Sequence, residues 1–145
     1  MPLQLEIVTP EKLAYSDTVD AVTLPGSEGE LGVLPHHAPL VSMLGVGELR
    51  IRKGGEIETF AIAGGFLQVR PDTVVVMAEM ADMASEIDLE KAQAARKEAE
   101  KALEGGFHEG ADLSAARASL QVALLRQRVA ERRHREGPRR SRIDG

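Results

Sequence analysis

The sequence of 145 residues contains no cysteine and no tryptophan, and aromatic residues make up only 3% of it. The lack of cysteine excludes disulfides, thiol catalysis and cysteine-ligated metal centres. Because few aromatic side chains are available to stack on bases, we expect no nucleic acid partner. No stretch approaches the ~18 apolar residues of a membrane span, and the first residues, MPLQLEIVTPEKL, lack the pattern of a secretory signal. Any contact with a membrane is therefore expected to be indirect.

Charge is distributed unevenly along the chain, whose formal net charge is −5. Residues 1–85 hold 5 Lys and Arg against 12 Asp and Glu, whereas residues 117–145 hold 9 against 3. A basic end on an otherwise acidic chain favours contact with an acidic surface.

The first half of the chain has the pattern of a β protein. Short runs with alternating apolar residues are separated by the turn signals PGSEG, KGG, AGG and RPD; the runs are LQLEIV (3–8), TVDAVTL (18–24), GELRIR (47–52), EIETFAIA (56–63), FLQVR (66–70) and TVVVMAE (73–79). Since no long helical segment lies between these runs, they predict an antiparallel sandwich rather than a parallel βαβ sheet.

Near Ala84 the composition changes to Ala, Glu, Lys and Arg, which predicts two helices. The first would begin at Ser85 as its N-cap, with Asp88 at the third helical position, and end at Gly105. The second would begin near Asp112 or Ser114 and end at about residue 136. Their apolar stripes are narrow and rich in alanine: Leu89, Ala92, Ala95 or Arg96, Ala99 and Ala102/Leu103, then Leu113, Ala116, Leu120, Ala123/Leu124, Gln127 and Ala130. Such stripes bury little area, so we expect a weakly held antiparallel hairpin that opens or docks again.

The predicted fold class is therefore α+β with segregated parts. Residues 1–84 would form an antiparallel β-sandwich, residues 85–137 a two-helix hairpin and residues 138–145 a basic flexible tail. Carboxylate pairs such as Glu28 and Glu30 have no nucleophile nearby in the sequence, so we expect no enzyme activity.

Three blocks of the sequence resemble the epsilon subunit of bacterial and chloroplast F-type ATP synthase. In GSEGELGVLPHHAPLVSMLGVGELRI (26–51), a Gly-Glu-x-Gly turn, a Leu-Pro-x-His-Ala-Pro-Leu loop and a Gly-x-x-x-Ile strand follow one another as they do in that family. The other two blocks are AIAGGFLQVRPDTVVVMAE (61–79) and EIDLEKAQAARKEAE (86–100). The resemblance covers about residues 3–135.

The resemblance implies a non-catalytic rotor subunit of the central stalk, present once per complex, that couples proton flow to ATP synthesis. Its sandwich would hold the gamma subunit and the c-ring, and its mobile hairpin would inhibit ATP hydrolysis by docking on the alpha and beta subunits. The subunit would lie at the cytoplasmic side of the inner membrane, in contact with it only through the c-ring. No cofactor is implied, apart from ATP as a regulatory ligand.

The resemblance also implies two sets of partner contacts. Glu30 and His37 would face gamma and the c-ring, in a loop that Pro35 and Pro39 stiffen. On an extended backbone His36 and His37 point in opposite directions, so we expect no metal site there. The arginines expected to dock on an acidic segment of the beta subunits are Arg126, Arg128, Arg132, Arg133 and Arg135. The alternatives are an ordinary surface loop and a solvated helix face.

Some members of the family bind ATP at an Ile/Leu-Asp-x-x-Arg-Ala motif. The corresponding candidate residues are Asp82, Ile87, Asp88, Lys91, Ala92 and Arg128. Lys91 keeps the charge of the family's arginine but lacks its planar fork, and Leu124 stands where the family has a second arginine. Asp88 is alternatively a plain helix cap. Two other functions stay open: a free-standing ATP-sensing module and a small RNA-binding adaptor.

Overall fold

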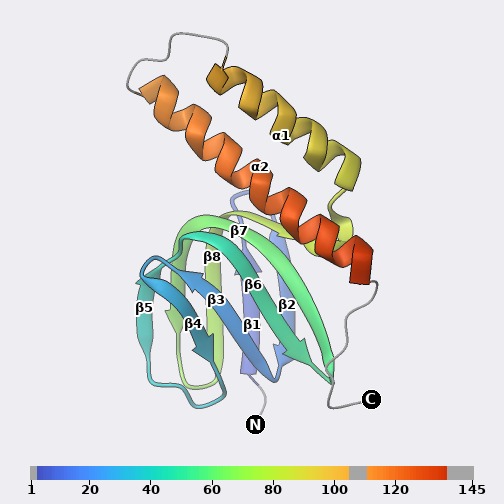
Figure 1. Ribbon diagram of the computed structural model, residues 1–145. Coiled ribbons are helices and arrows are strands. Elements are labelled where there is room, and N and C mark those ends of the chain that lie inside the picture. The colour runs from blue at the N-terminus through green and yellow to red at the C-terminus, as the bar shows by residue number, and fades with distance from the viewer. Residues whose placement is uncertain (1–2, 105–110, 137–145) are drawn as a thin grey trace.

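The computed structural model describes residues 3–104 and 111–136 of the chain, without the side chains of 111–112 and 134–136. Eight strands precede a short 3-10 helix and two long helices (Figure 1). The elements are β1 (Leu3–Val8), β2 (Leu13–Val19), β3 (Ala21–Gly26), β4 (Gly29–Val33), β5 (Leu40–Met43), β6 (Val46–Lys53), β7 (Glu56–Val69), β8 (Thr73–Met83), η1 (Ala84–Glu86), α1 (Leu89–Glu104) and α2 (Ala111–Glu136).

The strands form one sheet, in the order β2-β1-β8-β7-β6-β3-β4, which folds over itself into two layers. The long strand β7 pairs with β6 over its first half and with β5 over its second half. Its partner changes at Gly64 and Gly65, whose φ angles are 67° and 114°. Figure 1 shows β3 and β6 in front of β1 and β8. The predicted sandwich is therefore confirmed.

One strand pair departs from the antiparallel arrangement that the sequence predicts. β1 and β8 are parallel, with Leu5 opposite Val74 and Ile7 opposite Val76, so the sheet is mixed. Parallel neighbours need a long connection, and here the intervening strands provide it in place of a helix. The alternation in the sequence could not reveal this, because it is the same in both kinds of pairing.

The main core lies between the two layers. Leu3, Leu5 and Ile7 of β1 are fully buried, as their alternation predicts, and pack with residues of the opposite layer such as Leu49 and Phe60. Burial of this apolar surface is the principal stabilising contribution to the sandwich. Among the residues whose side chains the structure describes, none from the two helices belongs to this core.

Asp88, and not Ser85, caps the first long helix. The Lys91 N–H donates to Asp88 Oδ1 at 3.1 Å, and the Ala92 N–H donates to the Asp88 carbonyl at 2.9 Å. Ser85 lies within the 3-10 helix, and Ile87 after it is extended, so the predicted start was wrong by about one turn. α1 and α2 pack together, as predicted, with Ala92, Ala123 and Ala130 buried. The predicted tail, residues 138–145, lies outside the described residues.

Candidate functional site

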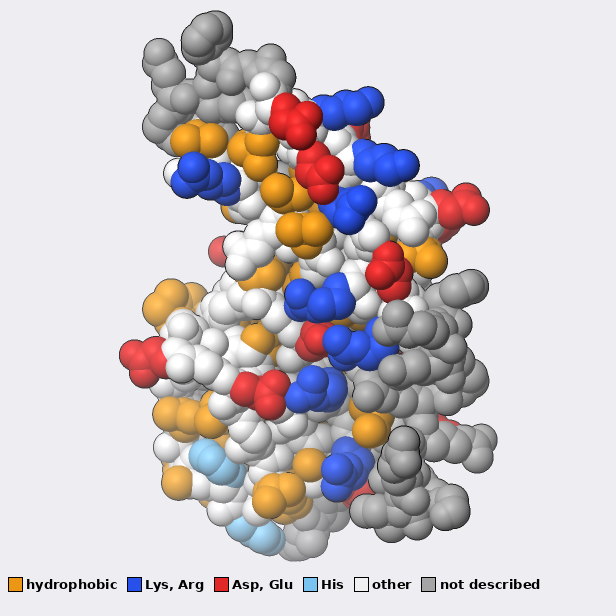
Figure 2. All heavy atoms as spheres, in the orientation of Figure 1, with side chains coloured by type: hydrophobic (Ala, Val, Ile, Leu, Met, Phe, Trp, Pro, Cys, Tyr) orange, Lys and Arg blue, Asp and Glu red, His pale blue; other side chains and the backbone are white. Residues whose placement is uncertain are grey.

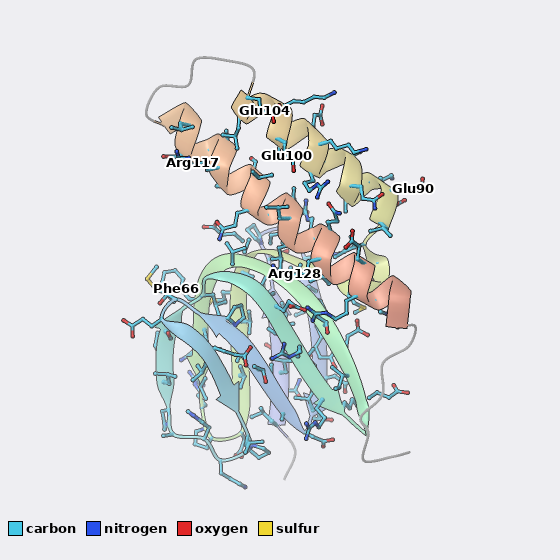
Figure 3. All side chains as sticks on the ribbon, in the orientation of Figure 1. Phe66, Glu90, Glu100, Glu104, Arg117 and Arg128 are labelled. Carbon is cyan, nitrogen blue, oxygen red and sulfur yellow. The ribbon has the colours of Figure 1, made fainter. Side chains whose placement is uncertain are left out.

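One outer face of the sandwich carries an exposed apolar row across three neighbouring strands. Met43 of β5 is paired with Phe66 of β7, which is paired with Met77 of β8. These three side chains, the apolar row, are 57%, 52% and 45% exposed. Val41, two residues before Met43 on the same face, is 71% exposed. Phe66 lies at the left edge of the sandwich in Figure 3. A contiguous apolar patch of this kind marks a surface for a partner.

The loop with the two histidines leads directly into this face, because β5 follows it. His36 has a positive φ of 66°, and its N–H donates to the Pro71 carbonyl at 2.7 Å. The predicted extended backbone was therefore wrong: the loop is a turn fastened to the β7–β8 connection. His37 Nδ1 lies 2.7 Å from the Ala38 carbonyl oxygen. In the part of the chain that the structure describes, no three His, Asp or Glu side chains are grouped to hold a metal ion.

The other predicted contact residues are spread over this end of the sandwich. Glu30 is exposed on β4 and forms an ion pair with Arg50 at 2.9 Å. Pro39 is exposed, whereas Pro35 and His37 are half-buried. Their contact with a partner stays a prediction.

Helix α2 packs against the second outer face of the sandwich. Glu48 of β6 is paired with Ala61 of β7, which is paired with Asp82 of β8, so these three residues form one row across the sheet. Leu125 and Val129 of α2 are 2% and 1% exposed and pack with Ala61 and Ala84. The small side chain of Ala61 lets the helix approach the sheet closely.

Arginines of α2 meet the two acids on either side of this apolar contact. Arg126 Nε donates to Asp82 Oδ2 at 2.7 Å. Arg132 donates from two nitrogens to the two oxygens of Glu48, at 2.5 and 3.1 Å. Arg128 Nε lies 3.9 Å from the same carboxylate, where α2 meets the sandwich (Figure 3). Figure 2 shows basic and acidic side chains side by side along this junction.

The five arginines predicted to dock on a partner are thus placed differently from one another. Arg126, Arg128 and Arg132 are engaged with acids of the sandwich. Arg133 lines a pocket of about 260 Å³ with Tyr15 and Glu58. The side chain of Arg135 lies outside the described residues.

Most of the predicted nucleotide-binding residues lie together in an open pocket of about 460 Å³ below α1. Asp82, Ile87, Asp88, Lys91 and Ala92 all line it, together with Arg126 and Lys12. Arg128, the sixth predicted residue, does not line this pocket but lies beside Glu48, and the arginine in the pocket is Arg126. Since Asp82 already accepts from Arg126, a phosphate would compete with that carboxylate. Nucleotide binding stays a prediction for this chain.

Comparison with known proteins assigns the chain to a family. Residues 2–84 match the model of the "ATP synthase, Delta/Epsilon chain, beta-sandwich domain", and residues 85–131 match the "long alpha-helix domain" of the same chain. The chain belongs to the ATP synthase epsilon chain family. It is 45% identical over 92% of its length to the ATP synthase epsilon chain of Dehalococcoides mccartyi, of which the match covers 95%. It is also 48% identical over 90% of its length to the ATP synthase epsilon chain of Syntrophobacter fumaroxidans, and the match covers 96% of that relative.

Solved structures agree with this assignment. A chain of the Euglena gracilis mitochondrial ATP synthase superposes with a TM-score of 0.73 at 27% identity, covering 85% of this chain and 78% of that one. A chain of the Tetrahymena thermophila enzyme, at 18% identity and a TM-score of 0.62 over 90% of this chain and 97% of that one, shares the fold. The family membership makes the chain a non-catalytic subunit of the ATP synthase complex. In the described residues, no helix is long and apolar enough to cross a membrane.

Sequence reasoning missed several residues of the two faces. Leu125 and Val129 form a second apolar stripe on α2, beside the alanine stripe, and their spacing of four residues was a usable signal. Glu48 lies in an alternating strand as one outward-facing residue among several, with nothing to single it out. The apolar row could not be read from the sequence, because Met43, Phe66 and Met77 come from three separate strands.

Proposed function

We propose that this chain is a rotor subunit of the central stalk, anchored by its sandwich and regulatory through its hairpin. The apolar row and the loop before β5 bind the gamma subunit and the c-ring. Contact with the membrane is indirect, at the cytoplasmic side of the inner membrane and through the c-ring. In this role the chain helps to couple proton flow to ATP synthesis.

The exposed apolar row carries this proposal. The row, which consists of Met43, Phe66 and Met77, lies on adjacent strands of a rigid sheet. Its apolar surface is removed from water only when another surface binds there, and this removal favours binding. Aromatic residues and methionine are enriched in the buried parts of protein interfaces. The two similar solved structures are also of ATP synthase assemblies that include a c-ring.

The contact between hairpin and sandwich supports the regulatory half of the proposal. Its apolar part is small: Ala61, Ala84, Leu125 and Val129 are buried there, and three further side chains are partly buried. A helix held by so little apolar area is suited to undock from the sandwich and to dock on it again. The arginines that would leave with α2 supply the charge for docking on an acidic surface of the alpha and beta subunits, where the hairpin inhibits ATP hydrolysis.

A charge placed in the apolar row tests the anchoring role. We expect Phe66→Glu to weaken binding to the gamma subunit by about tenfold or more, because a buried carboxylate without a partner disfavours the complex. Leu13→Glu is the matched control, since Leu13 is also exposed, at 57%, but lies outside the row on β2. Binding is measured by co-purification and titration of the full chain with gamma and the c-ring. Unchanged binding of Phe66→Glu would reject the proposed surface.

A further inference from the structure

Among the described residues, Glu48 is the least exposed carboxylate that forms an ion pair. Its side chain is only 12% exposed, against 37% for Asp82 and 61% for Glu30. It lies in the middle of β6, on the outer face, so the sandwich alone leaves it at the surface and α2 covers it. Its burial is therefore a consequence of the docking of the hairpin.

When the hairpin is docked, the ion-pair partners of Glu48 are arginines of α2. Arg132 binds both of its carboxylate oxygens, and Arg128 approaches one of them at 3.9 Å. A bidentate arginine–carboxylate pair adds geometric specificity to its electrostatic attraction, and partial burial reduces the screening of that attraction by salt. By contrast, Arg126 and Asp82 form a single bond in a more exposed place.

The position of Glu48 in its row explains how one carboxylate influences the whole helix. Ala61 beside it carries the apolar contact with Leu125 and Val129, and Asp82 beyond Ala61 holds Arg126. Arg126 lies between Leu125 and Val129 in the sequence and Arg132 lies after them, and the acids that they bind stand on opposite sides of Ala61. The two ion pairs therefore fix both the register of α2 and its direction across the sheet. Loss of the Glu48 pair leaves the C-terminal part of the described helix without a polar attachment to this row.

We propose that Glu48 is a latch: its carboxylate binds Arg132 in the docked hairpin, with Arg128 beside it, and thereby withholds Arg132 from an acidic partner. Arg132 cannot serve an external carboxylate while its two terminal nitrogens bind Glu48, so docking on the sandwich and docking on a partner exclude each other. The latch itself is a property of the isolated chain. Only its consequence for ATP hydrolysis rests on the proposed function.

Hydrogen exchange in the full chain tests the latch directly. Glu48→Gln keeps the size and an acceptor oxygen but removes the charge. We expect the amides of α2 around residues 123–132 to exchange about tenfold faster, because undocking exposes them more often and an isolated hairpin frays. The amides of β1 and β8 in the main core should exchange as before. Asp17→Asn is the matched control, since Asp17 pairs with Lys53, which is also a residue of the sandwich.

The outcomes separate the latch from the proposed function. If α2 exchanges at the original rate, or if the core amides accelerate as much as those of α2, Glu48 is not a latch. If α2 alone accelerates, the latch stands, and Glu48→Gln should then inhibit ATP hydrolysis more strongly in reconstituted ATP synthase. A loosened hairpin without stronger inhibition would leave the latch in place and overturn the regulatory role.

Discussion

Glu58 is a carboxylate in an unfavourable place. It lies on the core-facing side of β7, in line with Phe60, and among the described residues its Oε1 atom is buried without a hydrogen-bond partner. Burial raises the pKa of Glu58, which the charge of Arg133 partly opposes and which Glu86 and Glu56 reinforce. Because the folded state then binds a proton more tightly than the unfolded state, the stability of the fold falls as the pH rises through the raised pKa.

The variant Glu58→Gln should therefore stabilise the protein at neutral pH. Glutamine cannot ionise, so the cost of a buried charge disappears, and we expect the melting temperature at pH 7 to rise by about 2 °C, a small value because part of the group stays in contact with water. Below the ordinary pKa of 4.5 the wild-type carboxyl is protonated in both states, and the gain should vanish. Thermal unfolding at pH 4 and pH 7 measures this, with exposed Glu28→Gln as the control. An equal gain at both pH values would exclude ionisation of Glu58 as the cause.

Because β7 bends at Gly64 and Gly65, this single strand contributes to both layers of the sandwich. The AGG segment was predicted as a turn between separate strands, but the strand continues through it and changes partner. A Cβ atom at Gly65 would lie 2.0 Å from the carbonyl oxygen of Met77, and its φ of 114° is strained for any L side chain. Glycine is thus required here for close approach as well as for conformation.

Alanine at position 65 should separate β7 from β8. We expect Gly65→Ala to lower the free energy of unfolding by about 3 kcal/mol or more, since backbone strain and overpacking add. Gly32→Ala is the control, because Gly32 has no positive φ and nothing lies within 4 Å of an added Cβ. Urea unfolding of both variants provides the comparison. A loss in Gly65→Ala no larger than that in the control would refute the close approach.

The extent to which the sequence predicts these elements depends on how local their causes are. The KGG turn, with two glycines at positive φ, pairs Lys53 with Glu56, and this register places Glu48 opposite Ala61. Half of the surface on which α2 packs therefore follows from a short turn. The other half, Ala61 opposite Asp82, follows in the same way from the turn that pairs Val69 with Val74, because the register of β7 and β8 is unbroken through the bend. For the same reason, the alanine stripe of α2 was predictable from its period, whereas the stripe of Leu125 and Val129 acquires its meaning only from a sheet elsewhere in the chain.

The chain as a whole divides into a sandwich with its own core and a hairpin that adds little to it. In the part of the chain that the structure describes, the main cluster between the layers contains no helical residue, and the second cluster joins α2 to the outer face through a few side chains. This division places folding and anchoring in the strands. It leaves the position of the hairpin to a small apolar contact and to ion pairs, which change at modest free-energy cost.

Removal of residues 87–145 tests this division of roles. The truncated chain keeps all of the main core, so we expect it to fold cooperatively, with a melting temperature within a few degrees of that of the full chain, and to bind gamma and the c-ring as tightly. Reconstituted ATP synthase with the truncated chain should hydrolyse ATP faster than with the full chain, because the arginines of α2 are gone. Calorimetry, binding titration and a hydrolysis assay provide the three measurements. A truncated chain that folds and binds but leaves hydrolysis unchanged would separate anchoring from regulation and remove the regulatory role from the hairpin.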